Sequence, residues 1–264
     1  MGFVIVFDDI TTLLQAQRDA AWGEVARRLA HEIKNPLTPI QLSAERLRRR
    51  VLAGMSERDA EILERGTRTI VQQVETMQQM VNAFSEYARA PEMHVTHFSL
   101  NQLVSEVADL YRSHAPRTGI RLDLDQHIED IEADRGRVRQ ILNNLVTNAL
   151  EALEGVAQPV LEIATRLDNT SESEYASVTV CDNGPGFQRE LLGRVFDPYV
   201  TSKPKGTGLG LAIVKKIVEE HGGRIDADNR PEGGARIRVV LPVTDSTRTA
   251  GARERRDQLR RERA

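Results

Sequence analysis

Hydrophobic residues recur at alternating steps of four and three along the first third of the chain. This period predicts one long helix from about Thr12 to Val51 and a second from about Glu57 to Ala88. Two consecutive steps of four around Ile33, with Pro36 beside them, favour a local kink in the first helix. The first apolar stripe consists of Trp22, Ala26, Leu29, Ile33, Leu37, Ile40, Ala44, Leu47 and Val51, and the heptad seam of the second helix of Leu63, Thr67, Ile70, Val74, Met77, Val81, Phe84 and Ala88.

Each of these seams is narrow, so a single hairpin buries little apolar surface between its two helices. Two copies of the hairpin in a four-helix bundle would remove more of that surface from water. The pattern therefore predicts a homodimer. A structural coiled coil without chemistry is the alternative.

The pattern changes after Pro91, where segments with a period of two mix with helical segments. The absence of regular βαβ alternation favours a two-layer sandwich over a doubly wound sheet. The predicted fold class is α+β, with a helical hairpin that forms a dimeric four-helix bundle followed by a two-layer α/β sandwich. The predicted helices of this second part are 99–115, 134–153 with Asp134 as the N-cap, and 211–220, and the predicted strands are 120–125, 161–167, 178–180, 224–228 and 235–241.

Composition narrows the class of protein. The 264 residues are 40% hydrophobic and 28% charged, an ordinary balance for a globular chain, and the net charge of −3 gives no general attraction to nucleic acid. The single cysteine, Cys181, excludes an internal disulfide framework and fits a reducing compartment. No apolar run approaches the roughly 20 residues that span a bilayer. We therefore expect a cytoplasmic polypeptide that is not inserted in a membrane.

One histidine stands apart from the apolar stripe of the first helix. At 100° per residue, His31 lies about 200° from both Leu29 and Ile33, so it points into solvent, and Asn35 shares its face one turn later. An unperturbed imidazole has a pKa of about 6.5 and is an effective nucleophile near neutral pH. A solvent-facing histidine is usually inert surface, but the residues that flank His31 favour chemistry.

Three motifs in the second part carry polar or glycine residues at positions suited to a nucleotide. Asn144 and Asn148 project from one face of a predicted helix, and a buried helix seldom carries two amides without partners for them. Asp182 ends a predicted strand and can accept a hydrogen bond from a base amino group. It opens a turn with Gly184 and Gly186, for which an ordinary Asp-Asn-Gly turn is the alternative.

The third motif is Gly206-Thr207-Gly208-Leu209-Gly210, which precedes a helix, and glycines there expose backbone amides that can cradle phosphates. Between the two glycine motifs, the polar segment from Gln188 to Lys205 is predicted to be a mobile lid over the ligand. Phe196 and Tyr199 would dock this lid. Lys203 is a candidate for phosphate contact, although lysines in loops are usually only solvated.

Five motifs in this order resemble the sensor histidine kinases of two-component systems: His31-Glu32-Ile33-Lys34-Asn35-Pro36, Asn144-Leu145-Val146-Thr147-Asn148, Asp182-Asn183-Gly184-Pro185-Gly186-Phe187, Phe196-Asp197-Pro198-Tyr199 and Gly206-Thr207-Gly208-Leu209-Gly210-Leu211. The resemblance is strongest to NtrY-type nitrogen-regulatory kinases, notably over residues 30–41. It implies a Bergerat-type ATP site with the cofactors ATP and Mg²⁺, and Asn148 as the magnesium ligand. Many relatives have a basic side chain three residues later, where this chain has Glu151.

The resemblance also implies roles for the first motif. His31 would accept the phosphoryl group, Glu32 would hydrogen-bond the imidazole and act as base, and Asn35 would orient water in a phosphatase reaction. The expected activity is autophosphorylation of His31, transfer to an aspartate of a response regulator that is NtrX-like, and dephosphorylation of that regulator. A phosphatase-dominant sensor and an ATPase switch without histidine phosphorylation are the alternatives. Hairpin-loop handedness would decide whether phosphorylation occurs within or between subunits.

The resemblance further implies the domain order. Phe3–Phe7 and the residues after it resemble the exit of a PAS domain, so residues 1–15 would be the end of a truncated PAS domain and linker. Residues 16–90 would be the dimerisation and phosphotransfer domain, and residues 91–243 the catalytic ATP-binding domain. Residues 244–264, with seven arginines, are expected to be a disordered charged tail. The full-length receptor would be anchored in the inner membrane with this part in the cytoplasm.

Overall fold

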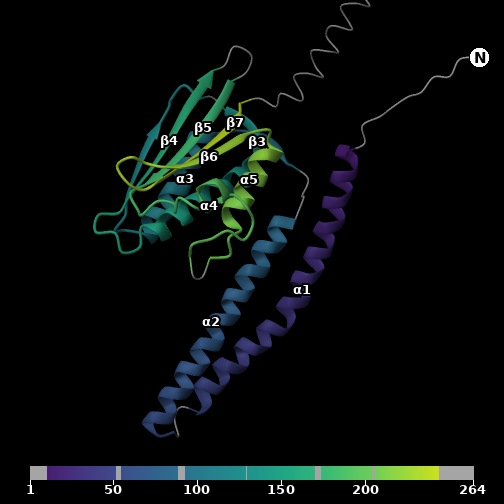
Figure 1. Ribbon diagram of the computed structural model, residues 1–264, viewed down its shortest axis with the longest axis vertical. Helices are drawn as coiled ribbons and strands as arrows, with labels where there is room; N and C mark the ends of the chain where they lie inside the picture. The colour runs from purple at the N-terminus through teal and green to yellow at the C-terminus, as the bar shows by residue number, and fades with distance from the viewer. Residues whose placement is uncertain are drawn as a thin grey trace, which may run out of the picture. The chain divides into compact units, whose positions relative to one another are not determined.

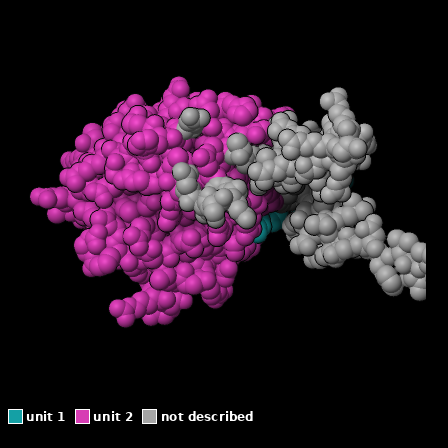
Figure 2. All heavy atoms as spheres, turned by 90° about the horizontal axis from the view of Figure 1, so that it is seen from above, with its two compact units in different colours: residues 1–92 teal, residues 93–264 magenta. Residues whose placement is uncertain are grey.

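The computed structural model describes residues 11–51, 55–88, 93–128, 130–169, 174–203 and 206–243, with side chains from residue 28 onward. The chain divides into two compact units, Met1–Glu92 and Met93–Ala264 (Figure 2). The predicted strand Phe3–Phe7 and the predicted tail 244–264 lie outside the described residues. No helix within the described ranges is long and apolar enough to cross a membrane.

The first unit is a helical hairpin, as predicted. Helix α1 (Thr11–Val51) continues through Pro36 and Pro39, and helix α2 (Glu57–Ala88) packs beside it (Figure 1). Between them, α1 buries Ala30, Leu37 and Ala44 at intervals of seven, and α2 buries Thr67 and Val74.

A single chain therefore buries only part of the predicted stripe of α1. Most of its members stay exposed in one chain because the hairpin covers only the row that contains Leu37 and Ala44, and the row includes Ala30, which the stripe omitted. The heptad seam of α2 is also buried only in part: Thr67 and Val74 are buried, whereas Ile70 and Met77 are exposed. The exposed members, with exposed fractions between 37% and 51%, are Leu29, Ile33, Ile40, Leu47 and Val51 on α1 and Ile70 and Met77 on α2.

The second unit is a two-layer α/β sandwich, as predicted (Figure 1). Its main sheet has the order β2-β4-β5-β7-β6, in which β2 and β4 are parallel and the other neighbours antiparallel. A separate two-stranded sheet pairs β1 with β3. The bounds are β1 Val95–Ser99, α3 Leu100–His114, β2 Gly119–Leu124, β3 Asp130–Asp134, α4 Arg135–Ala152, β4 Val160–Asn169, β5 Glu174–Asp182, the 3-10 turn η2 Leu192–Arg194, α5 Gly210–Glu220, β6 Arg224–Asn229 and β7 Ala235–Pro242.

The core of this unit lies between the main sheet and the three helices. Strand β7 alternates buried and outward residues, and β4 and β5 add buried apolar side chains, so one face of the sheet is apolar. Each helix contributes an apolar stripe. The buried side chains of the core include Leu103, Val107, Ile141, Leu145, Leu161, Ile163, Val178, Val180, Val214, Val218, Ile237, Val239 and Leu241.

Side-chain caps set where two of the helices begin. Ser99 Oγ accepts a hydrogen bond from the backbone N–H of Gln102 at the start of α3. Asp134 is the N-cap of α4, as predicted, and its Oδ1 accepts from Gly136 and Arg137. Burial would raise the Asp134 pKa, but these bonds and one from the His94 N–H outweigh it and hold the pKa below its usual value.

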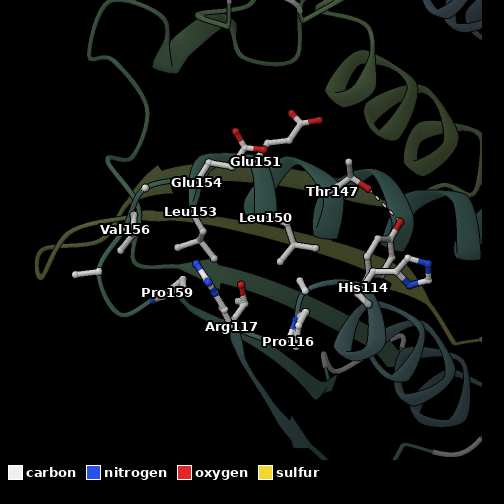
Figure 3. A pocket seen from close by; sticks show the side chains of 15 residues that line it. His114, Pro116, Arg117, Thr147, Leu150, Glu151, Leu153, Glu154, Val156 and Pro159 are labelled. Carbon is white, nitrogen blue, oxygen red and sulfur yellow. Dashed lines mark hydrogen bonds between the residues drawn. The ribbon is translucent and has the colours of Figure 1, made fainter.

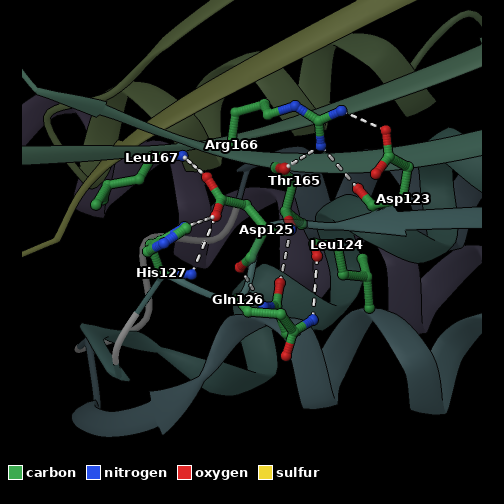
Figure 4. Close-up of polar contacts among 9 residues, drawn as sticks. Asp123, Leu124, Asp125, Gln126, His127, Thr165, Arg166 and Leu167 are labelled. Atoms are coloured by element: carbon green, nitrogen blue, oxygen red, sulfur yellow. Dashed lines mark hydrogen bonds and ion pairs between the residues drawn. The ribbon is translucent and has the colours of Figure 1, made fainter.

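The end of β2 is tied to α3 and β4 by a polar network (Figure 4). Thr165, which is fully buried, accepts a hydrogen bond from the Asp125 N–H and donates one to Asn101. The Asp125 carboxylate accepts backbone N–H groups from His127 and Leu167 and the His127 ring. The backbone bonds from His127 and then Leu167 are the main reason that the Asp125 pKa falls to about 2.

Candidate functional site

The phosphoacceptor candidate lies on the exposed surface of α1. His31, Glu32 and Asn35 are all exposed, as the helical wheel predicted for His31. The Glu32 carboxylate accepts a hydrogen bond of 3.2 Å from Arg28 Nε, one turn earlier on the same helix. This contact engages only Oε1 of Glu32, so Oε2 remains available for the expected role of Glu32 as a base toward His31.

The base-recognition candidate, Asp182, ends β5 with its side chain buried. Its Oδ1 accepts hydrogen bonds from the backbone N–H of Gly184 at 2.8 Å and of Ala235 at 3.3 Å. Ala235 opens β7, so the fold orients the carboxylate from two strands. Because these bonds hold one oxygen, the carboxylate is preorganised to accept from a ligand with the other.

The turn after Asp182 is held by two asparagines. Asn183 accepts from the Val160 N–H and donates to the Gln158 carbonyl, each at 2.8 Å. Asn229, at the end of β6, exchanges a pair of hydrogen bonds with the backbone of Phe187. Gly186 has φ +73°, and a side chain there would approach Asn229 Oδ1 to 2.7 Å. Asn229 is not part of any of the motifs, because it lies 42 residues after Phe187, within an ordinary strand pattern.

The two predicted amides lie on α4, beside the start of α5. Asn144 Nδ2 is buried and has no hydrogen-bond partner among the described residues. A Cβ atom added to Gly210 would lie 3.5 Å from Asn148 Nδ2, so the first residue of α5 lies directly against Asn148. An unsatisfied buried donor is costly, and a ligand that accepts a hydrogen bond would satisfy it.

The glycine motif forms the entry to α5. Leu209 is the N-cap of α5 and offers no side-chain hydrogen bond to the first turn, although its own N–H donates to Thr207 Oγ1. Gly208 has φ +67°, and a Cβ there would lie 2.5 Å from the Tyr199 carbonyl carbon. Because Leu209 gives no side-chain cap, the first-turn N–H groups of α5 are suited to bind an anion.

The segment predicted to be a lid contains η2 and several turns, and its residues 204–205 lie outside the described ranges. Phe196 is half-buried, as a docking residue should be. Tyr199 is 65% exposed. It contacts the glycine motif through its backbone, with φ +65° and an N–H that donates to the Gly208 carbonyl. Because Gly208 has no side chain, its backbone can lie this close to the backbone of Tyr199.

Lys203 is brought to α4. Its Nζ forms an ion pair with Glu151 and lies 3.4 Å from both the carbonyl oxygen and Oδ1 of Asn148. Gly206 donates its N–H to the Lys203 carbonyl, which closes the local turn. The structure thus brings Lys203 and the start of α5 to Asn148, one turn after Asn144 on α4. Gly184 approaches Ala152, the last residue of α4.

A separate hollow of about 930 Å³ lies between the end of α3, the second half of α4 and the loop before β4 (Figure 3). Leu150, Leu153 and Pro159 line it, and the Tyr111 hydroxyl and Thr147 Oγ1 are 3.1 Å apart at one side. Thr147 of the asparagine motif and the nearby Glu151 line this hollow, but Asn144, Asn148, Asp182 and the glycine motifs do not. It is not the nucleotide site that the motifs predict.

Both units match known domain families. Residues 21–92 match the "His Kinase A (phospho-acceptor) domain", and residues 133–245 match the "Histidine kinase-, DNA gyrase B-, and HSP90-like ATPase". The fold and the site thus define a phospho-acceptor hairpin joined to an ATPase-type sandwich.

Individual proteins show the same combination. Nitrogen regulation protein NtrY of Azorhizobium caulinodans is 43% identical over 242 residues, which cover 91% of this chain and 31% of that protein. The nucleotide-free catalytic domain of histidine kinase ThkA is 35% identical with a TM-score of 0.52, over 58% of this chain and 98% of that one. ThkA in complex with response regulator protein TrrA is 29% identical with a TM-score of 0.61, over 90% of this chain and 69% of that one.

This chain belongs to the sensor histidine kinases, and its sequence is similar to the NtrY type. It spans about a third of the length of the NtrY relative.

Proposed function

We propose that this chain is an ATP-dependent protein-histidine kinase that phosphorylates His31 and passes the phosphoryl group to an aspartate of a response regulator. The observation that carries the proposal is the pairing of an exposed histidine, in a phospho-acceptor domain, with a preorganised Asp182 and an unsatisfied Asn144 donor in an ATPase-type fold. In the reaction, an imidazole nitrogen of His31 attacks the γ-phosphorus. The P–N bond forms as the bond to the ADP oxygen breaks, so ADP leaves.

The chain's own residues bind and position the nucleotide. The Asp182 oxygen that backbone bonds leave available accepts a hydrogen bond from the adenine amino group. Asn144 Nδ2 and the first-turn N–H groups of α5 donate to phosphate oxygens. Lys203, Thr207 and Gly206 belong to the segment that covers the phosphates, and Phe196 anchors it. Glu32 accepts a proton from His31.

Magnesium fits the amide oxygen of Asn148, since Mg²⁺ prefers oxygen ligands and Asn148 Oδ1 has only the Lys203 ammonium, at 3.4 Å, as its hydrogen-bond partner within the described residues. When bound, the ion would neutralise charge that develops on the phosphates. Asn148 is therefore the proposed metal ligand of the chain.

The proposed assembly is a homodimer with a four-helix bundle. The exposed apolar rows of α1 and α2, which include Ile40 and Ile70, supply the surface that a second hairpin would cover. A partner response regulator is supported by the ThkA–TrrA complex and by the resemblance to NtrY, which favours an NtrX-like receiver and a role in nitrogen regulation. Asn35 would orient water when the regulator is dephosphorylated. We further propose that the full-length receptor is anchored in the inner membrane, with this part in the cytoplasm.

The test is incubation with Mg²⁺ and γ-labelled ATP, beside a His31→Gln variant and an Asn35→Ala variant. Acid-labile and alkali-stable label is expected on the wild type and on Asn35→Ala, and none on His31→Gln. Transfer of label to a receiver domain should follow. ATP turnover that is equal in wild type and His31→Gln, without label on either, would refute the kinase and favour an ATPase switch.

A further inference from the structure

Glu151 is the acidic residue that occupies a position near the expected phosphate site, three residues after Asn148 on α4. An isolated carboxylate there would repel a triphosphate. In Figure 3 the side chain of Glu151 extends from α4 on the side opposite Leu150, and both residues line the hollow. The Glu151 carboxylate pairs with the ammonium of Lys203.

Lys203 reaches α4 from an irregular segment whose backbone is held locally. The Lys203 N–H donates to Thr201 Oγ1 at 3.1 Å, and the Lys203 carbonyl accepts from Gly206 at 3.1 Å. These bonds place the Cα of Lys203 but leave its long side chain many rotamers. Among the described residues, the Lys203 ammonium is received by Glu151 and by the two oxygens of Asn148.

The Glu151–Lys203 pair adds little to the stability of the fold. The exposed fractions of the two side chains are 47% and 35%, and ion pairs in such solvent contact contribute little because water screens them. Its effect is positional, since the pair keeps one positive charge within 3.4 Å of the amide oxygen of Asn148. The positive charge beside Asn148 therefore comes from Lys203, while position 151 itself carries a negative charge.

We propose that Glu151 is a positioning residue that holds the Lys203 ammonium at the terminal-phosphate end of the nucleotide site. The inference rests on the proposed function of that site. Lys203 would neutralise the terminal phosphate, and Glu151 would restrict the ammonium to that place. The pair would then favour ATP over ADP, because only ATP carries the γ-phosphate.

The test measures the affinities of Mg-ATP and Mg-ADP by calorimetry, in a His31→Gln background so that no phosphoryl transfer disturbs binding. Glu151→Gln should lower the preference for ATP over ADP by about three- to fivefold, the size of one screened charge contact. Lys203→Met should lower it further, because it leaves the Glu151 carboxylate unpaired beside the phosphates. The double variant Glu151→Gln, Lys203→Met should recover part of that loss.

The matched control is Glu154→Gln, which removes the same charge just beyond the end of α4 without touching the Lys203 contact. It should leave the ratio of the two affinities at the wild-type value. Equal effects of Glu151→Gln and Glu154→Gln, or additive effects of the Glu151 and Lys203 changes, would overturn the proposal. Failure of the kinase proposal is seen separately, as unlabelled His31 in a wild-type protein that still binds ATP with the expected preference.

Discussion

Asn229 and Phe187, 42 residues apart in the chain, exchange two hydrogen bonds: Asn229 Oδ1 accepts the Phe187 N–H at 2.7 Å, and Asn229 Nδ2 donates to the Phe187 carbonyl at 2.8 Å. This reciprocal pair ties the turn that follows Asp182 to the end of β6. The turn carries Gly186 in a left-handed conformation against the same asparagine. The adenine side of the site thus depends on a residue outside the recognised motifs.

Asn229→Ala should weaken nucleotide binding with little change in overall stability. Each solvent-accessible hydrogen bond contributes roughly 0.5–1.5 kcal/mol, so the loss of two predicts an ATP affinity about tenfold lower. Asn229→Asp keeps the acceptor for the Phe187 N–H and loses the donor to the Phe187 carbonyl. Its affinity for ATP should therefore lie between those of the wild type and Asn229→Ala. Equilibrium titration with ATP measures the series, and an unchanged affinity for Asn229→Ala would remove this residue from the site.

Gly208→Ala should disrupt the glycine motif. At φ +67° an alanine is strained by about 1–2 kcal/mol, and its Cβ would overlap the Tyr199 backbone at 2.5 Å. ATP affinity and labelling of His31 should both fall at least tenfold. Gly193→Ala, in the same segment and with open space around its Cβ, should behave as wild type. A Gly208→Ala protein with full ATP affinity would show that the segment rearranges freely.

The Asp125 network predicts a defined pH dependence of stability. The folded-state pKa of about 2 lies below the ordinary value of 3.8, so the ionised carboxylate stabilises the fold above pH 4, and this contribution is lost as the pH falls toward 2. Asp125→Asn should therefore lower the melting temperature at pH 7, and its difference from wild type should narrow between pH 4 and pH 2. Asp123→Asn, which breaks only an exposed ion pair with Arg166, is the control. A difference that stays constant with pH would contradict this account.

The exposed apolar rows predict that Ile70→Glu separates the proposed dimer. A glutamate there would have to bury its charge in the bundle, at a cost of several kcal/mol, so light scattering should show a monomer where the wild type is a dimer. Gln72→Glu changes an exposed residue about 200° away from Ile70 around α2 and should stay dimeric. Equal masses for the two variants would place the interface elsewhere.

Several elements were predictable because their signals are local. Ser99 and Asp134 cap α3 and α4 through bonds to residues two or three positions on, and the alternation of β7 shows its buried face within eight residues. Strands β1 and β3 escaped prediction because each has five residues, many of them polar. Their pairing joins Val95 to Asp134, so only the distant partner identifies them.

The sequence by itself determined the two domains, the exposed histidine and the positions of the nucleotide motifs, since helical period, turn chemistry and motif spacing act over a few residues. Only the tertiary structure decided which row of α1 packs on α2, how Ala235 orients Asp182, and that Lys203 meets Glu151. The last two contacts join residues 53 and 52 positions apart, and they depend on the path of the whole chain. A local sequence pattern does not identify such partners. The entropy cost of closing the chain between them, and the energy of their contact, arise only when the two segments meet.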